Sequence, residues 1–287
     1  MDATDQSRPS HTALRVALRR AAHQLYDAPP RVLDDPIAIA ILGPHADQLQ
    51  RTPGRNPEYK ARPHSVGLRA FLVARSRYAE DQLAQAVAHG VTQYVLLGAG
   101  LDTFAHRNPY PHLRVFEVDH PATQQWKREL LQAIGLPCPA HLTYAPVDFE
   151  RQSLAEQLHA AVFDSTVPSL FAWLGVVPYL THEAFRTTLS FISAQPPSSG
   201  VVFDYCQPRE VLAPNEQLAR DSLASRVQLA NEPFQLFFTP EEAAAELKKF
   251  HGIEDLGSRE IDARYFAGRT DALKLHGSAD RLVSAWL

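Results

Sequence analysis

The sequence contains little cysteine, and the two cysteines fit no metal site. Cys138 and Cys206 lie far apart in the chain of 287 residues, and their separation matches no metal-ligand spacing. The N-terminal residues also lack the basic and apolar regions of a secretory signal peptide. We therefore expect a cytoplasmic protein, in a reducing setting, that holds no metal.

The sequence also lacks an excess of positive charge and a long apolar run. It has 28 lysines and arginines against 32 acidic residues, with both signs interspersed, so no basic face for nucleic acid is indicated. No apolar run approaches the ~18 residues that span a membrane. Because 45% of the residues are hydrophobic, the chain can bury a full core. We expect a soluble monomer or homodimer that acts on a small molecule and binds neither nucleic acid nor a membrane.

The absence of a third glycine limits which ligand the glycine motif at residues 98–100 can bind. The apolar run from Tyr94 to Leu97 leads into Gly98 and Gly100, which is typical of a buried strand that feeds a tight turn beside a ligand. Glycine has no Cβ, so a ligand can approach its backbone closely. The dinucleotide fingerprint needs a third glycine three residues later, where this chain has Thr103. The motif therefore favours a ligand without a pyrophosphate, such as S-adenosylmethionine (SAM), over NAD.

Hydrophobic periodicity and turn residues predict alternating helices and strands along the chain. In the N-terminal part we expect helices at 12–28, 36–42 and 67–89, with a loop at 43–65. The predicted strands that follow are 94–97, 115–119, 143–147, 168–174 and 201–205. Helices are predicted between them at 122–134, 154–162 and 181–192. A helical stretch at 208–231 and a helix starting at Thr239 precede strand-like segments at 253–256, 272–276 and 282–286.

This alternation predicts an α/β fold with a doubly wound, mostly parallel sheet. We expect the chain to be organised in four parts, each a continuous range. They are N-terminal helices with a lid loop at 1–90, a SAM-binding Rossmann-like core at 91–207, a helical lid insertion at 208–251, and C-terminal strands completing the core sheet at 252–287.

Candidate ligand contacts follow from the strand ends, because open parallel sheets bind ligands beyond the carboxyl ends of their strands. Asp119 ends the second of the predicted parallel strands and can accept hydrogen bonds from a ribose diol. Glu117, on the same face of that strand, is the alternative candidate for the ribose contact. Asp148 follows the third strand and can accept the amino group of an adenine, or can instead cap a helix.

Several motifs together resemble one family. The segments Leu97–Thr103 with Arg107, and Phe116–Pro121 with Lys127, are similar to signatures of the leucine carboxyl methyltransferase-like branch of class I SAM-dependent methyltransferases. Further matching segments are Thr12–Ala13, Asp35–Pro36, Ala74–Arg77 with Asp81, Trp173–Leu180 and Arg264–Arg269. The resemblance covers nearly the whole chain and implies a class I methyltransferase fold with SAM as cofactor.

The resemblance also implies residue roles. Arg75 would pair with the carboxylate of SAM, since a guanidinium matches a carboxylate bidentately. Asp119 would hold the ribose, Asp148 with its neighbour Phe149 the adenine, and the glycines would pass under the methionine portion. The implied cofactor site comprises Arg75, Gly98, Gly100, Asp119, His120, Asp148, Phe149 and Leu174.

One position departs from the family pattern. Where many relatives have a glutamate before the glycine of the fourth-strand motif, this chain has Leu174. A polar contact near the methionine end of the cofactor is therefore missing or supplied by another residue.

We expect methyl transfer to an oxygen, most simply a carboxylate, of a small metabolite of secondary metabolism. An ionised carboxylate needs no general base, whereas a phenol or an alcohol does. The candidate catalytic residues are Tyr179 and Tyr205, at strand ends, and Arg264, which could neutralise an acidic substrate. The alternatives are methylation at carbon or nitrogen, a non-methylating reaction on the same scaffold, and a SAM-binding regulator without turnover.

Overall fold

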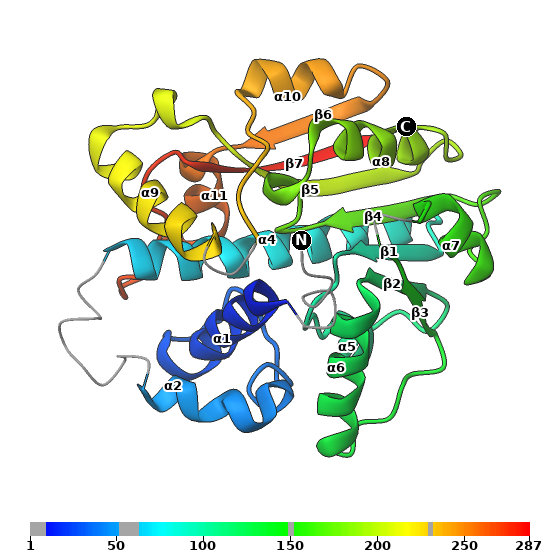
Figure 1. Cartoon of the computed structure of the whole chain (residues 1–287), viewed down its shortest axis with the longest axis horizontal. Coiled ribbons are helices and arrows are strands. Elements are labelled where there is room, and N and C mark those ends of the chain that lie inside the picture. The colour runs from blue at the N-terminus through cyan, green and yellow to red at the C-terminus, as the bar shows by residue number, and fades with distance from the viewer. Residues whose placement is uncertain (1–9, 52–62, 149–151, 229–231) are drawn as a thin grey trace, which may run out of the picture.

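A seven-stranded sheet forms the centre of the molecule (Figure 1). The computed structural model describes residues 10–51, 63–148, 152–228 and 232–287. The strands lie in the order β3-β2-β1-β4-β5-β7-β6, with β7 antiparallel to both of its neighbours and the other pairs parallel. Their bounds are β1 (Gln93–Leu97), β2 (Arg114–Asp119), β3 (Leu142–Pro146), β4 (Ser169–Trp173), β5 (Gly200–Cys206), β6 (His251–Leu256) and β7 (Asp280–Trp286). The predicted doubly wound, mostly parallel α/β fold is confirmed.

The five parallel strands predicted from the sequence are found within one residue at each end. Every residue of β1, β4 and β5 is buried. A strand that is covered on both faces has a nearly continuous apolar sequence, and this is why these strands could be predicted.

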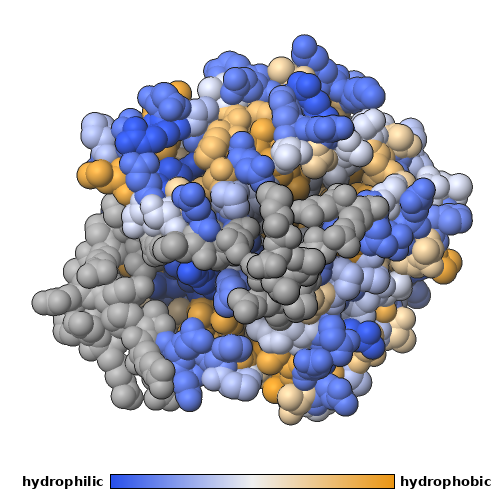
Figure 2. All heavy atoms as spheres, viewed as in Figure 1, coloured by the Kyte–Doolittle hydropathy of each residue, from blue (hydrophilic) through white to orange (hydrophobic). Residues whose placement is uncertain are grey.

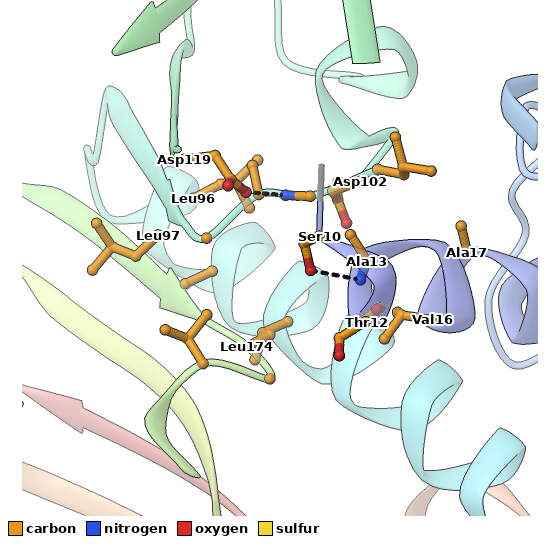
Figure 3. A pocket seen from close by; sticks show the side chains of 18 of the residues that line it. Ser10, Thr12, Ala13, Val16, Ala17, Leu96, Leu97, Asp102, Asp119 and Leu174 are labelled. Atoms are coloured by element: carbon orange, nitrogen blue, oxygen red, sulfur yellow. Dashed lines mark hydrogen bonds between the residues drawn. The ribbon is translucent and has the colours of Figure 1, made fainter. Parts of the chain in front are cut away.

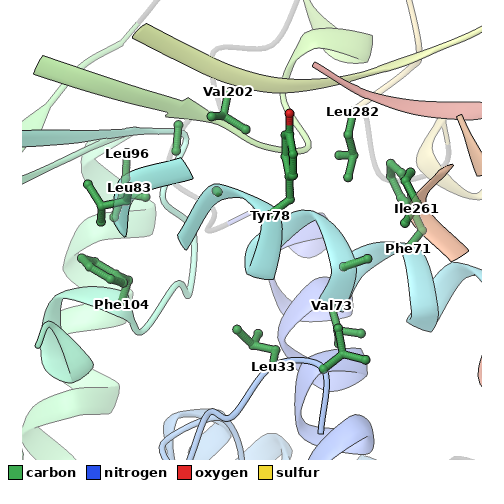
Figure 4. Packing of buried hydrophobic residues seen from close by; sticks show 14 of the residues in the cluster. Leu33, Phe71, Val73, Tyr78, Leu83, Leu96, Phe104, Val202, Ile261 and Leu282 are labelled. Atoms are coloured by element: carbon green, nitrogen blue, oxygen red, sulfur yellow. The ribbon is translucent and has the colours of Figure 1, made fainter. Parts of the chain in front are cut away.

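Helices cover both faces of the sheet (Figure 1). One face carries α4 (Pro63–Ala88), α5 (Phe104–Arg107), α6 (Pro121–Ala133) and α11 (Ser258–Tyr265). The opposite face carries α7 (Leu154–Ala160), α8 (His182–Ser193) and α10 (Pro240–Glu246). Figure 4 shows the core on the first face, where Phe71 and Tyr78 of α4 pack toward Val202 of β5 and Leu282 of β7.

The N-terminal segments form an additional layer beside the carboxyl ends of the parallel strands. It consists of α1 (His11–Tyr26), the 3-10 helix η1 (Ala40–Ala46) and α2 (Asp47–Arg51). A buried ionic network fixes α1 to the core: Arg20 pairs with Asp35, donates to Thr103 at 2.7 Å, and contacts Asp102 at 3.2 Å. The range 43–65, which was predicted to be a loop, contains α2 and the start of α4. Its residues 52–62 lie outside the described residues.

Two C-terminal expectations differ from the structure. The segment at 272–276 is not a strand, although Leu273 and Leu275 are buried in alternation. The backbone N–H of Leu275 donates to the side chain of Asp262 at 2.8 Å instead of to a neighbouring strand. The sequence analysis also missed α11, a short, mostly polar helix whose one fully buried side chain is Ile261. The stretch from 208 contains the 3-10 helix η3 (Arg209–Val211) and α9 (Pro214–Gln228).

Outside the residues drawn in grey, the face shown in Figure 2 is mostly hydrophilic, with smaller areas of exposed hydrophobic residues between the charged ones. Among the described residues, no helix combines the length and the hydropathy that a membrane span requires.

Candidate functional site

A cavity of about 280 Å³ lies at the carboxyl ends of β1, β2 and β4. β1 has β2 on one side and β4 on the other, so the strand order reverses at this point, where doubly wound folds bind ligands. Figure 3 shows Thr12, Ala13 and Val16 of α1 facing the strand ends that carry Asp119 and Leu174. We refer to this space as the cofactor pocket.

The turn after β1 forms the floor of the cofactor pocket. Gly98 and Gly100 have φ angles of +69° and +50°, a region that other residues rarely adopt. The backbone N–H groups of Gly98 and Ala99 both donate to the carbonyl of Val118, at 2.8 and 3.0 Å. A Cβ at Gly98 would overlap Val176, and one at Gly100 would lie 3.1 Å from the Cβ of Ala13. The turn therefore needs glycine because two other segments press close to it.

Asp119 and His120 mark one end of the cofactor pocket. The Asp119 carboxylate accepts the backbone N–H of Gly100 at 2.5 Å and that of His120 at 2.7 Å. Burial raises the pKa of Asp119. His120 caps α6, its ring accepting the N–H of Ala122 at 3.2 Å. Glu117, the alternative candidate for the ribose contact, is fully buried and does not line the pocket. Its Oε2 lies 2.6 Å from Nζ of Lys127.

Arg75 lies at the other end, on α4. Its Nη1 donates to Asp204 of β5 at 2.9 Å, and the second Asp204 oxygen accepts the N–H of Gly175 at 2.5 Å. Gly175 has φ of +70°, and a Cβ there would lie 2.5 Å from Nη2 of Arg75. The absence of a side chain at Gly175 thus makes room for the guanidinium. The role of Asp204 as the partner of Arg75 was not predicted.

A second cavity, of about 220 Å³, adjoins the cofactor pocket and shares lining residues with it. The shared residues are Thr12, Val16, Arg75, Gly175 and Tyr179. We call this space the acceptor cavity. Its apolar walls come mainly from α4, α9 and the residues before α10: Leu68, Phe71, Leu72, Leu223 and Phe234. The charged residues Arg15 and Arg19 of α1, Asp204 of β5 and Asp280 of β7 also line it.

Tyr179, in the 3-10 helix η2 (Val177–Tyr179), lies where the two cavities meet. Its ring contacts that of Phe234, with centroids 5.2 Å apart. Burial raises the pKa of Tyr179, so its hydroxyl keeps its proton at neutral pH and can donate a hydrogen bond. The neighbouring Thr12 hydroxyl donates to the carboxylate of Glu232, a residue that the sequence analysis did not single out.

The structure brings together most of the predicted cofactor residues and one of the predicted catalytic residues. The cofactor pocket is lined by Arg75, Gly98, Gly100, Asp119, His120, Leu174 and Tyr179. Asp148 follows β3, where its backbone exchanges hydrogen bonds with Gln152, and it lies outside the lining of the pocket. Phe149 lies outside the described residues.

Tyr205 and Arg264 lie away from both cavities, which differs from their predicted place. Side chains alternate along β5, so Tyr205 points to the face opposite Asp204, packs on Phe203, and donates to Asp255 at 2.8 Å. Arg264, on α11, forms two hydrogen bonds with Glu254, at 2.5 and 3.0 Å.

Comparison with known proteins shows the family to which the chain belongs. Residues 13–193 match the model of the leucine carboxyl methyltransferase family. YktD of Bacillus subtilis strain 168, which bears the name of a SAM-dependent methyltransferase, is 32% identical over 290 residues, covering 92% of this chain and 93% of its own. Rv0281 of Mycobacterium tuberculosis H37Rv, similarly named, is 33% identical over 189 residues, covering 64% of this chain and 61% of its own.

Solved structures share the fold at low sequence identity. A crystal structure from Thermobifida fusca YX, titled as a methyltransferase, has a TM-score of 0.60 and 17% identity, covering 98% of this chain and 96% of its own. A DUF574 family protein from Streptomyces avermitilis has a TM-score of 0.58 and 17% identity, covering 98% of both chains. Because the family match spans well over half of the sequence and a relative aligns along almost all of it, the chain belongs to the leucine carboxyl methyltransferase family.

Proposed function

We propose that this SAM-dependent methyltransferase transfers a methyl group to a carboxylate oxygen of a small metabolite with an apolar body. The observation that carries the proposal is the junction of the two cavities, where Arg75 and Tyr179 both present hydrogen-bond donors.

The donor set of the cofactor pocket fits SAM. An acid, Asp119, stands at one end, where it can accept hydrogen bonds from the ribose, and a guanidinium, Arg75, stands at the other, facing the amino-acid carboxylate. Gly98 and Gly100 form the floor between them, His120 and Leu174 line the walls, and Asp148 would lie toward the adenine. When bound, SAM supplies a methyl group activated by its sulfonium.

The acceptor cavity suits an apolar body that ends in an ionised oxygen. Tyr179 can donate a hydrogen bond to the acceptor. The charged residues that line the cavity are three arginines, Arg15, Arg19 and Arg75, and two aspartates, Asp204 and Asp280. Among the described residues that line this cavity none is a histidine, and burial raises the pKa of Cys206 well above its usual value. The two carboxylates in the lining, Asp204 and Asp280, are each paired with an arginine. A carboxylate acceptor needs no base, so a junction with hydrogen-bond donors and with its carboxylates already paired favours it over a phenol or an alcohol.

The chain's main contribution is positional. An in-line displacement requires the acceptor oxygen, the methyl carbon and the sulfur to be collinear, and such alignment is worth roughly 7–11 kcal/mol. α1 and the segment after α9 cover the junction and exclude water from it, with Thr12 of the first contacting Glu232 of the second.

Methyl transfer from isotopically labelled SAM to a panel of apolar carboxylic acids, phenols and amines tests this proposal. We expect methyl esters of the acids as products, and expect Tyr179→Phe to lower kcat while changing SAM affinity little. Tyr144→Phe is the matched control, since Tyr144 lies on β3 outside both cavities. Products methylated at nitrogen or carbon would contradict the proposal. SAM binding without transfer to any acid would favour a regulator.

A further inference from the structure

We propose that Glu232 binds the ammonium group of SAM, so that the residues from 232 to the start of α10 contribute to the cofactor site. The inference rests on the cofactor orientation proposed above, with the amino-acid carboxylate at Arg75. It assigns a role to a charged residue that neither the sequence motifs nor the proposed reaction uses.

Glu232 lines the cofactor pocket and accepts a hydrogen bond from Thr12, which lies at the junction of the two cavities with Arg75 and Tyr179. It lines that pocket together with Tyr179 and Gly175, and it does not line the acceptor cavity. Burial is the main cause of the raised pKa of Tyr179, and the negative charge of Glu232 contributes to the rise. Glu232 is therefore close to where the amino-acid portion of SAM would lie and not to its ribose.

A comparison of charges identifies Glu232 as the acceptor for a cation. SAM carries an ammonium, a carboxylate and a sulfonium, and three carboxylates line the described part of the pocket. Asp119 is at the ribose end, and Asp102 is matched by Arg20 at 3.2 Å and by the N–H of Phe104 at 2.7 Å. Among the side chains that the structure describes, which do not include those of residues 226 and 227, Glu232 meets the neutral hydroxyl of Thr12 and no lysine or arginine.

Among the described residues, the opposite wall supplies no competing side-chain carboxylate that is without a partner. Leu174 lines the same pocket with an aliphatic side chain, and both oxygens of Asp204 are already occupied by Arg75 and Gly175. An ammonium ion placed here without a carboxylate would lose its hydration without compensation. Glu232 supplies that compensation.

The segment that carries Glu232 is fixed against the site by its backbone. The N–H groups of Gln235 and Leu236 donate to the carbonyl of Pro178 at 2.7 and 3.2 Å, and the Gln235 side chain donates to the carbonyl of Tyr179 at 2.8 Å. Further along, the N–H of Phe238 donates to the carbonyl of Cys206 at 3.0 Å. These bonds hold the segment in a constant position relative to Tyr179.

Calorimetric titration of the full chain with two ligands tests the inference. The ligands are S-adenosylhomocysteine and its analogue without the α-amino group. We expect Glu232→Gln to weaken binding of S-adenosylhomocysteine at least tenfold, about 1.4 kcal/mol, and to leave the affinity for the deaminated analogue unchanged. Glu241→Gln, on the exposed first turn of α10, is the matched control and should bind both ligands as the wild type does.

Two results would overturn the inference. An equal loss for both ligands would mean that Glu232 acts only by closing the segment over the pocket, and Thr12→Val would then show the same equal loss. Unchanged affinity for both ligands would mean that the ammonium lies elsewhere. Failure of the wild type to bind S-adenosylhomocysteine at all would instead contradict the proposed function, so the two failures can be distinguished.

Discussion

The ion pair between Arg75 and Asp204 should reveal itself as a pH-dependent stability. Their side chains are 9% and 6% exposed, so neither charge is well solvated. Removing one member of a buried pair costs about 3–5 kcal/mol, because the other charge is left uncompensated. In Arg75→Met, however, Asp204 keeps the N–H of Gly175 and can take up a proton. We therefore expect the free energy of unfolding to fall by about 3 kcal/mol at pH 7.5, the lower end of that range.

The size of this loss should depend on pH in a defined direction. Burial already raises the pKa of Asp204 above its ordinary 3.8, although Arg75 opposes the shift. Without Arg75 the folded-state pKa rises further. A carboxyl whose pKa is higher in the folded than in the unfolded protein stabilises the fold at low pH, and this contribution is lost as the pH rises through the folded-state value. Arg75→Met should therefore be less destabilised at pH 5 than at pH 7.5.

Urea unfolding followed by tryptophan fluorescence at both pH values measures the effect. Asp204→Asn is the matched control, because it leaves the charge of Arg75 uncompensated. Since arginine does not lose its proton, the loss of unfolding free energy in this variant should not be smaller at pH 5 than at pH 7.5. The double variant Arg75→Met/Asp204→Asn should lie closer to the wild type than either single variant. Equal losses for Arg75→Met at the two pH values, or strict additivity in the double variant, would refute the reasoning.

Three further predictions concern other residues. Asp119→Ala should weaken SAM binding at least tenfold in calorimetry, about 1.4 kcal/mol, without unfolding the protein; an unchanged affinity would show that the ribose end is misassigned. Lys127→Met should cost about 3–5 kcal/mol in urea unfolding, because Glu117 is fully buried and its Oε1 already has no partner, and adding Glu117→Gln should recover part of the loss. Burial lowers the pKa of His106 to about 4, below its ordinary 6.5, so stability should be lost as the pH falls from 6.5 toward 4. In thermal unfolding, His106→Phe should lose less stability than the wild type between pH 6.5 and pH 4. The same pH profile for both proteins would contradict the role given to His106.

Much of the fold and one end of the site could be predicted because their signals are local. Continuous apolar runs end at glycine, aspartate or proline, and these ends are where the structure places the strand termini. Asp119 is directly attached to such an end, so predicting the strand also placed the carboxylate. Arg75 carries no local signal of its own, and its place became predictable only through the resemblance to a family.

The rest depended on contacts between distant segments. Asp204 and Tyr205 are adjacent at a strand end, but alternation sends one to Arg75 and the other into the opposite core. Leu273 and Leu275 alternate as in a strand, yet β7 occupies the place beside β5. Glu232 lies in a segment without periodicity, and it reaches the pocket only because its chain bonds to the carbonyls of η2 and β5.

The position of β7 also has a consequence for the order in which the chain folds. β6 precedes β7 in the sequence, but in the sheet it pairs with β7 and not with β5. Until residues 280–286 reach β5, that strand presents an open apolar edge, and β6 has no place in the sheet. We expect β6 and β7 to assemble in one late step, after the parallel strands have formed. A folding intermediate with the β5 edge exposed is therefore the species most prone to aggregate, and slower synthesis at lower temperature should increase the yield of folded protein.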